Sequence, residues 1–332
     1  MRQKLKRGLI MCLCACLLAG GPTGCSHFEN TEFVLTTGLT ENQLFKVGSS
    51  ICTLPEAMIY VMDYQRQYES VYGVEMWEHD FGGITLEEYV KNIIVSQLAA
   101  MKAVTLLAAD YEVELTETEM EHVRKAAREY YSSMGDDAVK YMGLKAENVE
   151  SLYHDHVLSG KVYQEITKDV NTEVSDDEAR IITVWQIHLD TRESAEDILE
   201  KLSEGKEFMT LASAYSQDSQ ISYTFGRGEK PAAYEEAAFA LENEGVSGII
   251  EEEDGYYILK CVNNFDREAT EANKVTMVER RRDEIFSGVY EELVANTPSE
   301  FNTRVWEQIH FEDWTGEIPV SFLEIYSEYF DV

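Results

Sequence analysis

The most specific pattern in this chain spans residues 184–262, which read VWQIHLDTRESAEDILEKLSEGKEFMTLASAYSQDSQISYTFGRGEKPAAYEEAAFALENEGVSGIIEEEDGYYILKCV. Hydrophobicity alternates over 184–189, which predicts a strand with Gln186 and His188 on one face. Apolar residues then recur three and four positions apart, which predicts two amphipathic helices: Ala195, Ile198, Leu199 and Leu202, followed by Phe208, Leu211, Ala212 and Tyr215. We expect a short helix over 234–241 and a strand over 256–262. This order predicts one compact α+β domain.

The spacing of these residues resembles a known motif. Residues 195–218 follow the pattern A-x-x-I-x-x-x-L-x-x-G-x-x-F-x-x-L-A-x-x-Y-S-x-D, and Phe225-Gly226-Arg227-Gly228 and Gly255-Tyr256 continue it in order. The pattern resembles that of the parvulin-type peptidyl-prolyl isomerases. The resemblance covers about a quarter of the chain. It implies a sheet of four strands flanked by helices, with a shallow pocket for a proline ring.

The resemblance also implies a set of site residues. Parvulins use two histidines, a cysteine or aspartate, and three apolar side chains. The two histidine positions hold Gln186 and Tyr257, and the cysteine or aspartate position holds Asp218, as in bacterial members. The apolar positions, and a nearby aromatic position that matches the family, hold Ser222, Lys230, Tyr234 and Phe239. The departures therefore concentrate where the family's chemistry lies, whereas the scaffold positions match.

Three expectations follow for the altered pocket. Gln186 and Tyr257 can form a hydrogen bond across neighbouring strands. His188 either substitutes in part for the missing histidine or is a histidine of the core or rim. The stem of Lys230 should lie along the pocket with its ammonium in water near Asp218 and Glu229, because burying a charge is costly.

The N-terminus predicts export and anchoring. Residues 1–24 form a basic start and a short apolar run, which is typical of a secretory signal peptide. Pro22-Thr23-Gly24-Cys25 resembles a bacterial lipobox, in which Cys25 is lipidated and becomes the mature N-terminus. Pro22 departs from that pattern, which prefers leucine, and ordinary secretion with Cys25 as a spare thiol is the alternative. We expect a polar tether over 25–43.

Charge and cysteine use narrow the classes of partner. Removal of residues 1–24, which hold four basic and no acidic side chains, takes the formal charge from −34 to −38. Such a surface repels nucleic acid and anionic headgroups, so we expect no nucleic-acid partner. Cys52 and Cys261 lie in different predicted elements, and we expect two buried free thiols. No Cys/His cluster has zinc-site spacing, and we expect no cofactor.

The chain before the parvulin-like part predicts a helical domain over 44–175. A small hairpin about Gly48 comes first. Capping boxes then begin helices after Thr53, Thr85 and Thr116, the second helix running over 86–111, and a further helix covers 146–170. This layout resembles the extracytoplasmic foldases and chaperones of the PrsA and SurA type. The fold class is therefore α+β, with the parvulin domain, residues 176–266, inserted into a largely helical domain.

The C-terminal part predicts a return to the helical domain. A helix begins this part, residues 267–311, and its Arg280-Arg281-Arg282 run should meet acidic groups of the chain itself. Residues 301–311 should pack on the N-terminal helices, as in this family. The acidic and aromatic tail, 312–332, is either a docked amphipathic helix or an apolar patch for clients.

Two functions remain open at this stage. The first is a peptidyl-prolyl cis-trans isomerase acting on secreted polypeptides, with Tyr234 and Phe239 gripping proline and Asp218 near the amide. The second is a non-catalytic holdase that keeps the parvulin unit as a scaffold or weak peptide binder. The resemblance favours the first, and the substituted site positions favour the second.

Overall fold

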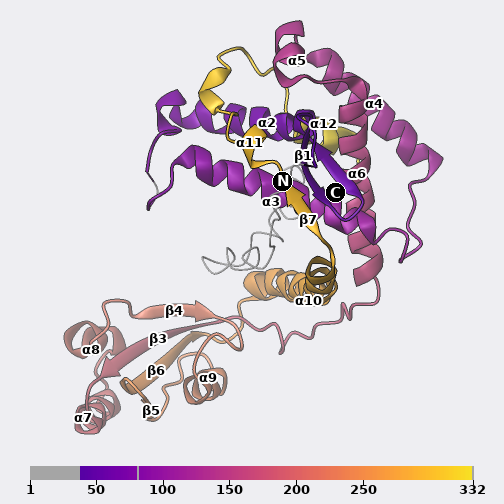
Figure 1. Ribbon diagram of the computed structural model, residues 1–332. Helices are drawn as coiled ribbons and strands as arrows, with labels where there is room; N and C mark the ends of the chain where they lie inside the picture. The colour runs from indigo at the N-terminus through magenta and orange to yellow at the C-terminus, as the bar shows by residue number, and fades with distance from the viewer. Residues whose placement is uncertain (1–37, 81, 331–332) are drawn as a thin grey trace. The chain divides into compact units, whose positions relative to one another are not determined.

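The computed structural model describes residues 38–80 and 82–330 (Figure 1). The predicted signal peptide, Cys25 and most of the predicted tether lie outside the described residues. The chain divides into two compact units. The helical unit comprises the chain up to residue 169 together with residues from 283 onward, and the sheet unit comprises 170–282.

The helical unit is built from long helices and one small sheet. Its main helices are α2 (Leu54–Tyr72), α3 (Leu86–Leu106), α4 (Glu117–Ser133), α5 (Asp136–Met142), α6 (Ala146–Thr167) and α12 (Phe322–Tyr329). Short helical turns are η2 (Val74–Met76), α11 (Thr303–Trp306) and η3 (Phe311–Asp313). The sheet has the order β2-β1-β7, with β1 (Gln43–Val47), β2 (Ser50–Thr53) and β7 (Ser299–Phe301). Helix α10 (Arg267–Asn296) starts in the sheet unit and ends in the helical unit.

The predicted helix starts are confirmed. The side chains of Thr53, Thr85 and Thr116 each accept a hydrogen bond from the amide three residues on, and the glutamate at that position bonds back. The predicted end of the second helix is wrong, because α3 stops at Leu106. The amide of Val113 bonds the carbonyl of Ala108, and Glu112 takes a φ of 55°, so the chain reverses although apolar residues continue.

The C-terminal segment packs on the N-terminal helices, as predicted. Strand β7 pairs with β1, with Phe301 opposite Phe45. Phe311 stacks on Trp77 with ring centroids 4.2 Å apart. The tail is a docked helix rather than an apolar patch, because Phe322 of α12 is only 1% exposed.

The core of the helical unit also holds a charged cluster. Nζ of Lys102 lies 2.9 Å from Oε1 of Glu56 and 2.6 Å from Oδ2 of Asp155. The side chains of Lys102 and Glu56 are each 3% exposed. A buried ammonium between two carboxylates is stable only while all three groups are present, because each partner offsets the desolvation of the others.

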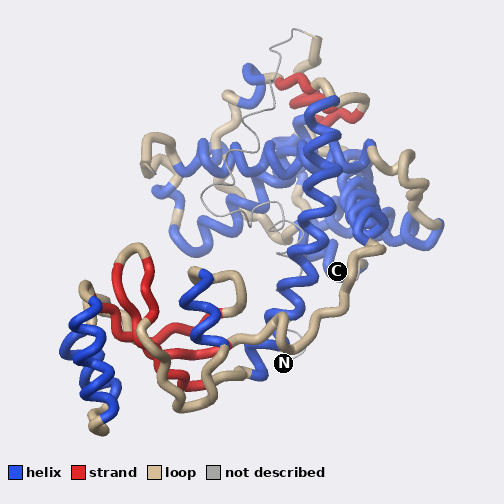
Figure 2. The backbone as a smooth tube through the Cα atoms, turned by 90° about the horizontal axis from the view of Figure 1, so that it is seen from below, coloured by secondary structure: helices blue, strands red, loops and turns tan. Residues whose placement is uncertain are grey.

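The sheet unit is an antiparallel four-stranded sheet covered on both faces (Figure 2). The strand order is β4-β3-β6-β5, with β3 (Ile182–Leu189), β4 (Ser222–Phe225), β5 (Ile250–Glu252) and β6 (Gly255–Asn263). The helices are α7 (Arg192–Ser203), α8 (Phe208–Tyr215) and α9 (Ala232–Phe239). Helices α7 and α8 pack on the face that carries Ile187 and Ile258, and α9 packs on the face that carries Val184 and Leu259. The predicted fold class and strand alternation are confirmed.

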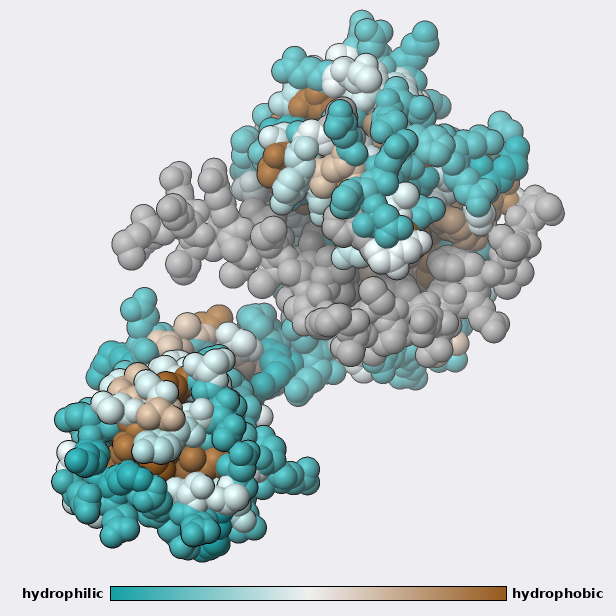
Figure 3. Space-filling view, turned by 90° about the vertical axis from the view of Figure 1, so that its left-hand side faces the viewer, coloured by the Kyte–Doolittle hydropathy of each residue, from teal (hydrophilic) through white to brown (hydrophobic). Residues whose placement is uncertain are grey.

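Two smaller expectations have outcomes in the described residues. Cys52 and Cys261 are buried free thiols, as predicted. Arg281 meets an acidic group of its own unit, 2.5 Å from Glu178. Among the described residues, every helix is too short or too polar to cross a membrane. The visible surface is mostly hydrophilic, with apolar residues in small patches (Figure 3).

Candidate active site

Most of the predicted site residues gather on the α9 face of the sheet unit. Because side chains alternate along a strand, β3 points both Gln186 and His188 to this face. Strand β6 supplies Tyr257, the segment after α8 supplies Asp218, and α9 supplies Tyr234. Cross-strand register places His188 opposite Tyr257. Residues separated by 71 positions in sequence thus meet in one site.

Asp218 is the centre of a hydrogen-bonded network. Its Oδ2 accepts from Nε2 of Gln186 at 2.6 Å, and its Oδ1 lies 3.2 Å from Nδ1 of His188. The side chain of Asp218 is 33% exposed, whereas that of His188 is 12% exposed. The carboxylate is therefore held from beneath by two side chains and faces solvent on its remaining side.

The expected hydrogen bond between Gln186 and Tyr257 is not formed. Tyr257 lies opposite His188, whereas Gln186 lies opposite Leu259. The hydroxyl of Tyr257 donates to Oδ2 of Asp254 at 2.9 Å. Oε1 of Gln186 accepts instead from the hydroxyl of Tyr234 at 2.8 Å. Burial raises the pKa of both tyrosines, so both phenols remain neutral donors.

His188 belongs to the network rather than to an isolated rim position. Its Nε2 lies 3.1 Å from the carbonyl oxygen of Asp254, and its ring stacks on Tyr257 with centroids 4.4 Å apart. Both ring nitrogens therefore face acceptors, an arrangement that only the imidazolium satisfies fully. Burial acts against the charged form, but the hydrogen bonds to Asp218 and Asp254 outweigh it and raise the pKa of His188 above its ordinary value.

Lys230 lies over aromatic rings and forms no ion pair with Asp218 or Glu229. Its Nζ lies 4.3 Å from the ring centroid of Tyr223, 5.6 Å from that of Tyr234 and 5.7 Å from that of Phe225. We call these three rings the aromatic floor. The expected partner Glu229 is engaged elsewhere, because its Oε1 accepts from the amide of Gly226 at 3.0 Å. Cation–π attraction to three ring faces therefore takes the place of the expected acidic partners.

Phe239 and Ser222 lie outside the hydrogen-bonded network. The Phe239 ring packs against Phe225, and the guanidinium groups of Arg180 and Arg227 lie 4.9 Å and 4.4 Å from its centroid. Phe239 therefore contacts the aromatic floor through Phe225. Ser222 is exposed at the start of β4, opposite Trp185. The structure thus brings Gln186, Asp218, Tyr234 and Tyr257 together and places Lys230 on the floor beside them. Phe239 lies at the margin, and Ser222 lies opposite Trp185, on the α7–α8 face.

Sequence reasoning missed Asp254 and Tyr223. Asp254 precedes Gly255 at the turn between β5 and β6, and both its carbonyl and its carboxylate bond to site residues. An acidic residue before glycine signals only a turn. Tyr223 lies in the stretch that departs from the parvulin pattern, so no family position pointed to it.

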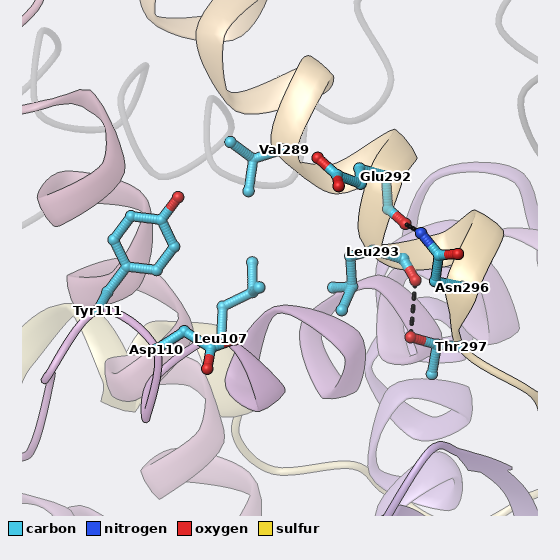
Figure 4. Close-up of a pocket in the computed structure, with 8 residues that line it drawn as sticks. All are labelled: Leu107, Asp110, Tyr111, Val289, Glu292, Leu293, Asn296 and Thr297. Carbon is cyan, nitrogen blue, oxygen red and sulfur yellow. Dashed lines mark hydrogen bonds between the residues drawn. The ribbon is translucent and has the colours of Figure 1, made fainter.

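A hollow of about 450 Å³ lies in the helical unit, between the end of α3 and the end of α10 (Figure 4). Leu107, Tyr111, Val289 and Leu293 line it, with Asp110 and Glu292 at its edge. The hydroxyl of Thr297 and the amide of Asn296 bond carbonyls of α10 itself. The hollow presents polar and apolar surface in similar amounts. Among the described residues, no three His, Cys, Asp or Glu side chains group as metal ligands.

The antiparallel sheet, its covering helices and the carboxylate-centred site define a class of domain. Residues 188–263 match the family model described as the PPIC-type PPIase domain, or rotamase. This part of the chain is a parvulin-type peptidyl-prolyl isomerase domain. It is inserted between helical N- and C-terminal regions.

Homologues over most of the chain carry the name Foldase protein PrsA. The one from Caldanaerobacter subterraneus is 24% identical over 277 residues, which cover 74% of this chain and 85% of the relative. The one from Halalkalibacterium halodurans is 27% identical over 210 residues, 58% of this chain and 61% of the relative. A crystal structure of the peptidylprolyl isomerase PrsA from Bacillus cereus is 20% identical, covers 90% of this chain and 99% of that chain, and gives a TM-score of 0.34.

Proposed function

We propose that this chain is an extracytoplasmic folding factor whose parvulin-type domain, residues 176–266, slowly isomerises prolyl bonds of unfolded secreted polypeptides. The observation that carries the proposal is the partly exposed carboxylate of Asp218, which Gln186 and His188 fix beside the aromatic floor. The match to the rotamase family model supports the reaction class. The PrsA name of the relatives supports the role in folding.

The reaction suits such a site because it breaks no covalent bond and needs no cofactor. The barrier of roughly 18–20 kcal/mol is the amide resonance lost when the C–N bond twists. A carboxylate near the amide oxygen disfavours the charge-separated form of the planar amide, so it favours the twisted one. Asp218 supplies this charge in our proposal. Gln186 and His188 hold it in place, Tyr257 orients His188 through the stacked rings, and Tyr234 contacts the proline ring.

A proline-tetrapeptide isomerisation assay on the mature chain tests this proposal. We expect measurable turnover, and we expect Asp218→Asn to lower it at least tenfold. Asp197→Asn is the matched control, because Asp197 lies on α7, on the opposite face of the sheet, and should leave the rate unchanged. A mature chain that does not exceed the uncatalysed rate would exclude the isomerase.

A holdase without catalysis is the second candidate, and one observation favours it. Lys230 covers the aromatic floor, and every side chain of the network already has a hydrogen-bond partner. In this alternative the helical unit binds unfolded chains. Replacing residues 176–266 by a short Gly/Ser linker should then leave suppression of client aggregation intact, measured by light scattering. Loss of all suppression while the helices stay folded assigns the activity to the parvulin-type domain instead.

We further propose that Cys25 carries a lipid anchor that tethers the chain to the outer face of the bacterial cell membrane. The basic and apolar residues of 1–24 and the lipobox-like Pro22-Thr23-Gly24-Cys25 support this. Cys25→Ala should release the protein from the membrane fraction. Mass spectrometry that finds an unmodified mature N-terminus at another residue contradicts the anchor.

A further inference from the structure

The C-terminal tail inserts one phenylalanine into an aromatic recess of the helical unit. The recess is formed by Tyr60, Tyr130, Tyr153 and His156. The ring of Phe322 stacks on Tyr153 with centroids 4.0 Å apart and an interplanar angle of 9°. His156, Tyr130 and Tyr60 surround it at 5.3, 5.8 and 6.2 Å. Ile325, one turn later, is 2% exposed. The tail therefore docks through two apolar side chains spaced as i and i+3.

The recess also binds the backbone of the tail. The Asp63 carboxylate accepts from the amide of Phe322 at 3.0 Å and from the hydroxyl of Ser321 at 2.9 Å. The hydroxyl of Tyr153 donates to the carbonyl of Phe322 at 2.9 Å. An acceptor for the amide, a donor for the carbonyl and an aromatic cup for the side chain are what a site for a hydroxyl-residue–phenylalanine dipeptide requires.

The tail fits this surface imperfectly. The described part of the chain has four buried side-chain polar atoms without a hydrogen-bond partner. One of them, the hydroxyl of Tyr130, belongs to the recess, and two more, Oε1 of Gln65 and Nε1 of Trp314, lie at the connecting segment that precedes residues 321–329. Gln65 lies against the connecting segment, because its amide nitrogen donates to the carbonyl of Trp314 at 2.7 Å. Each buried polar atom left unpaired weakens the docked state relative to a state in which water or another ligand pairs it.

The buried carboxylate adds to this weakness. Desolvation raises the pKa of Asp63 to about 6, against the hydrogen bonds from Phe322 and Ser321 that favour its charged form. Above that pH the docked tail therefore covers a charged group that water would solvate better. Among the described residues, α12 forms one ion pair, between Glu324 and Arg66 at 3.2 Å. Because Glu324 is 60% exposed, this ion pair contributes little to docking. Residues 314–320, which connect η3 to residues 321–329, form neither helix nor strand.

We propose that the aromatic recess is a peptide-binding site and that residues 321–329 are its internal, displaceable occupant. The partner is a segment of an unfolded polypeptide that presents phenylalanine directly after serine or threonine, with a second aliphatic residue three positions later. This partner class rests on the proposed function, whereas the recess and its occupant rest on the contacts above. The tail then acts as a competitor that keeps the recess covered until a better-satisfied segment replaces it.

Fluorescence anisotropy with a labelled peptide of residues 319–330 tests the proposal. We expect the peptide to bind a chain that lacks residues 319–332 and to bind the full chain at least tenfold more weakly, because the covalently attached tail competes. A Phe322→Ala peptide should lose binding, and a Ser327→Ala peptide should keep it, since Ser327 is exposed. Equal affinity of the peptide for both chains, or no binding to a folded truncated chain, overturns the proposal.

A second variant covers the case in which truncation unfolds the protein. A protease site inserted at residues 315–317, which are exposed, allows the tail to be cut after folding. We expect the cut tail to exchange with excess labelled peptide, and a cut tail that never exchanges contradicts displacement. A dimer that exchanges tails, seen by size exclusion, contradicts an internal occupant. Neither the anisotropy nor the exchange experiment measures isomerisation or client aggregation. Failure of the proposed function would instead be seen when the full chain is tested in the isomerisation and aggregation assays.

Discussion

Substitution of Lys230 by methionine should uncover the aromatic floor that we propose as the contact surface for a proline ring. The ammonium lies over three aromatic faces at 4.3, 5.6 and 5.7 Å, and the residue is half-buried. Cation–π contacts contribute about 0.5–1 kcal/mol when exposed and about 2 kcal/mol when desolvated. A proline ring that uses the floor must first displace this cation, at about 1–2 kcal/mol. Methionine keeps an unbranched stem without the charge, so the affinity for a proline peptide should rise about 5- to 30-fold.

Titration calorimetry with a proline peptide measures this change. Lys230→Arg keeps a cation over the rings and should give no gain. Lys260→Met is the matched control, because Nζ of Lys260 lies 5.6 Å from the ring of Trp185, on the other face of the sheet. An unchanged or lower affinity of the folded Lys230→Met protein, with Lys260→Met behaving the same way, would refute the reasoning that Lys230 competes for the floor.

Three further predictions concern the core and the network. Lys102→Met should lower the free energy of unfolding by about 3–5 kcal/mol in a urea titration, because it leaves two buried carboxylates unpaired, and an unchanged midpoint would contradict this. Asp218→Asn should lower the pKa of His188 in an NMR titration, and identical titrations would contradict the network. Because folding raises that pKa, the stability from His188 is fully present below pH of about 6.5 and is lost as pH rises through the folded pKa. Adding Gln186→His and Tyr257→His to Lys230→Met should raise the isomerisation rate. If the unmodified protein already turns over proline peptides at a rate typical of enzymes, the natural residues at these positions do not disable the site.

The sequence alone determined those features that depend on neighbouring residues. The alternation of β3 placed Gln186 and His188 on one face, because side chains in a strand alternate with a period of two. The capping boxes after Thr53 and Thr116 marked helix starts, because the hydrogen bonds that close them span only three residues. The spaced pattern over 195–218 predicted the parvulin-type domain that the family model matches.

Tertiary structure decided which distant groups meet. The pairing of His188 with Tyr257 depends on the register of β3 and β6, and the bond from Tyr257 to Asp254 depends on the turn after β5. Lys230 contacts three aromatic rings and not the expected acidic groups, because the fold brings these rings together beneath it. The docking of the tail through Phe322 likewise required residues from α2, α4 and α6 to form one recess. Local patterns report backbone conformation, whereas the energy of a buried charge or ring depends on side chains that only the folded chain brings together.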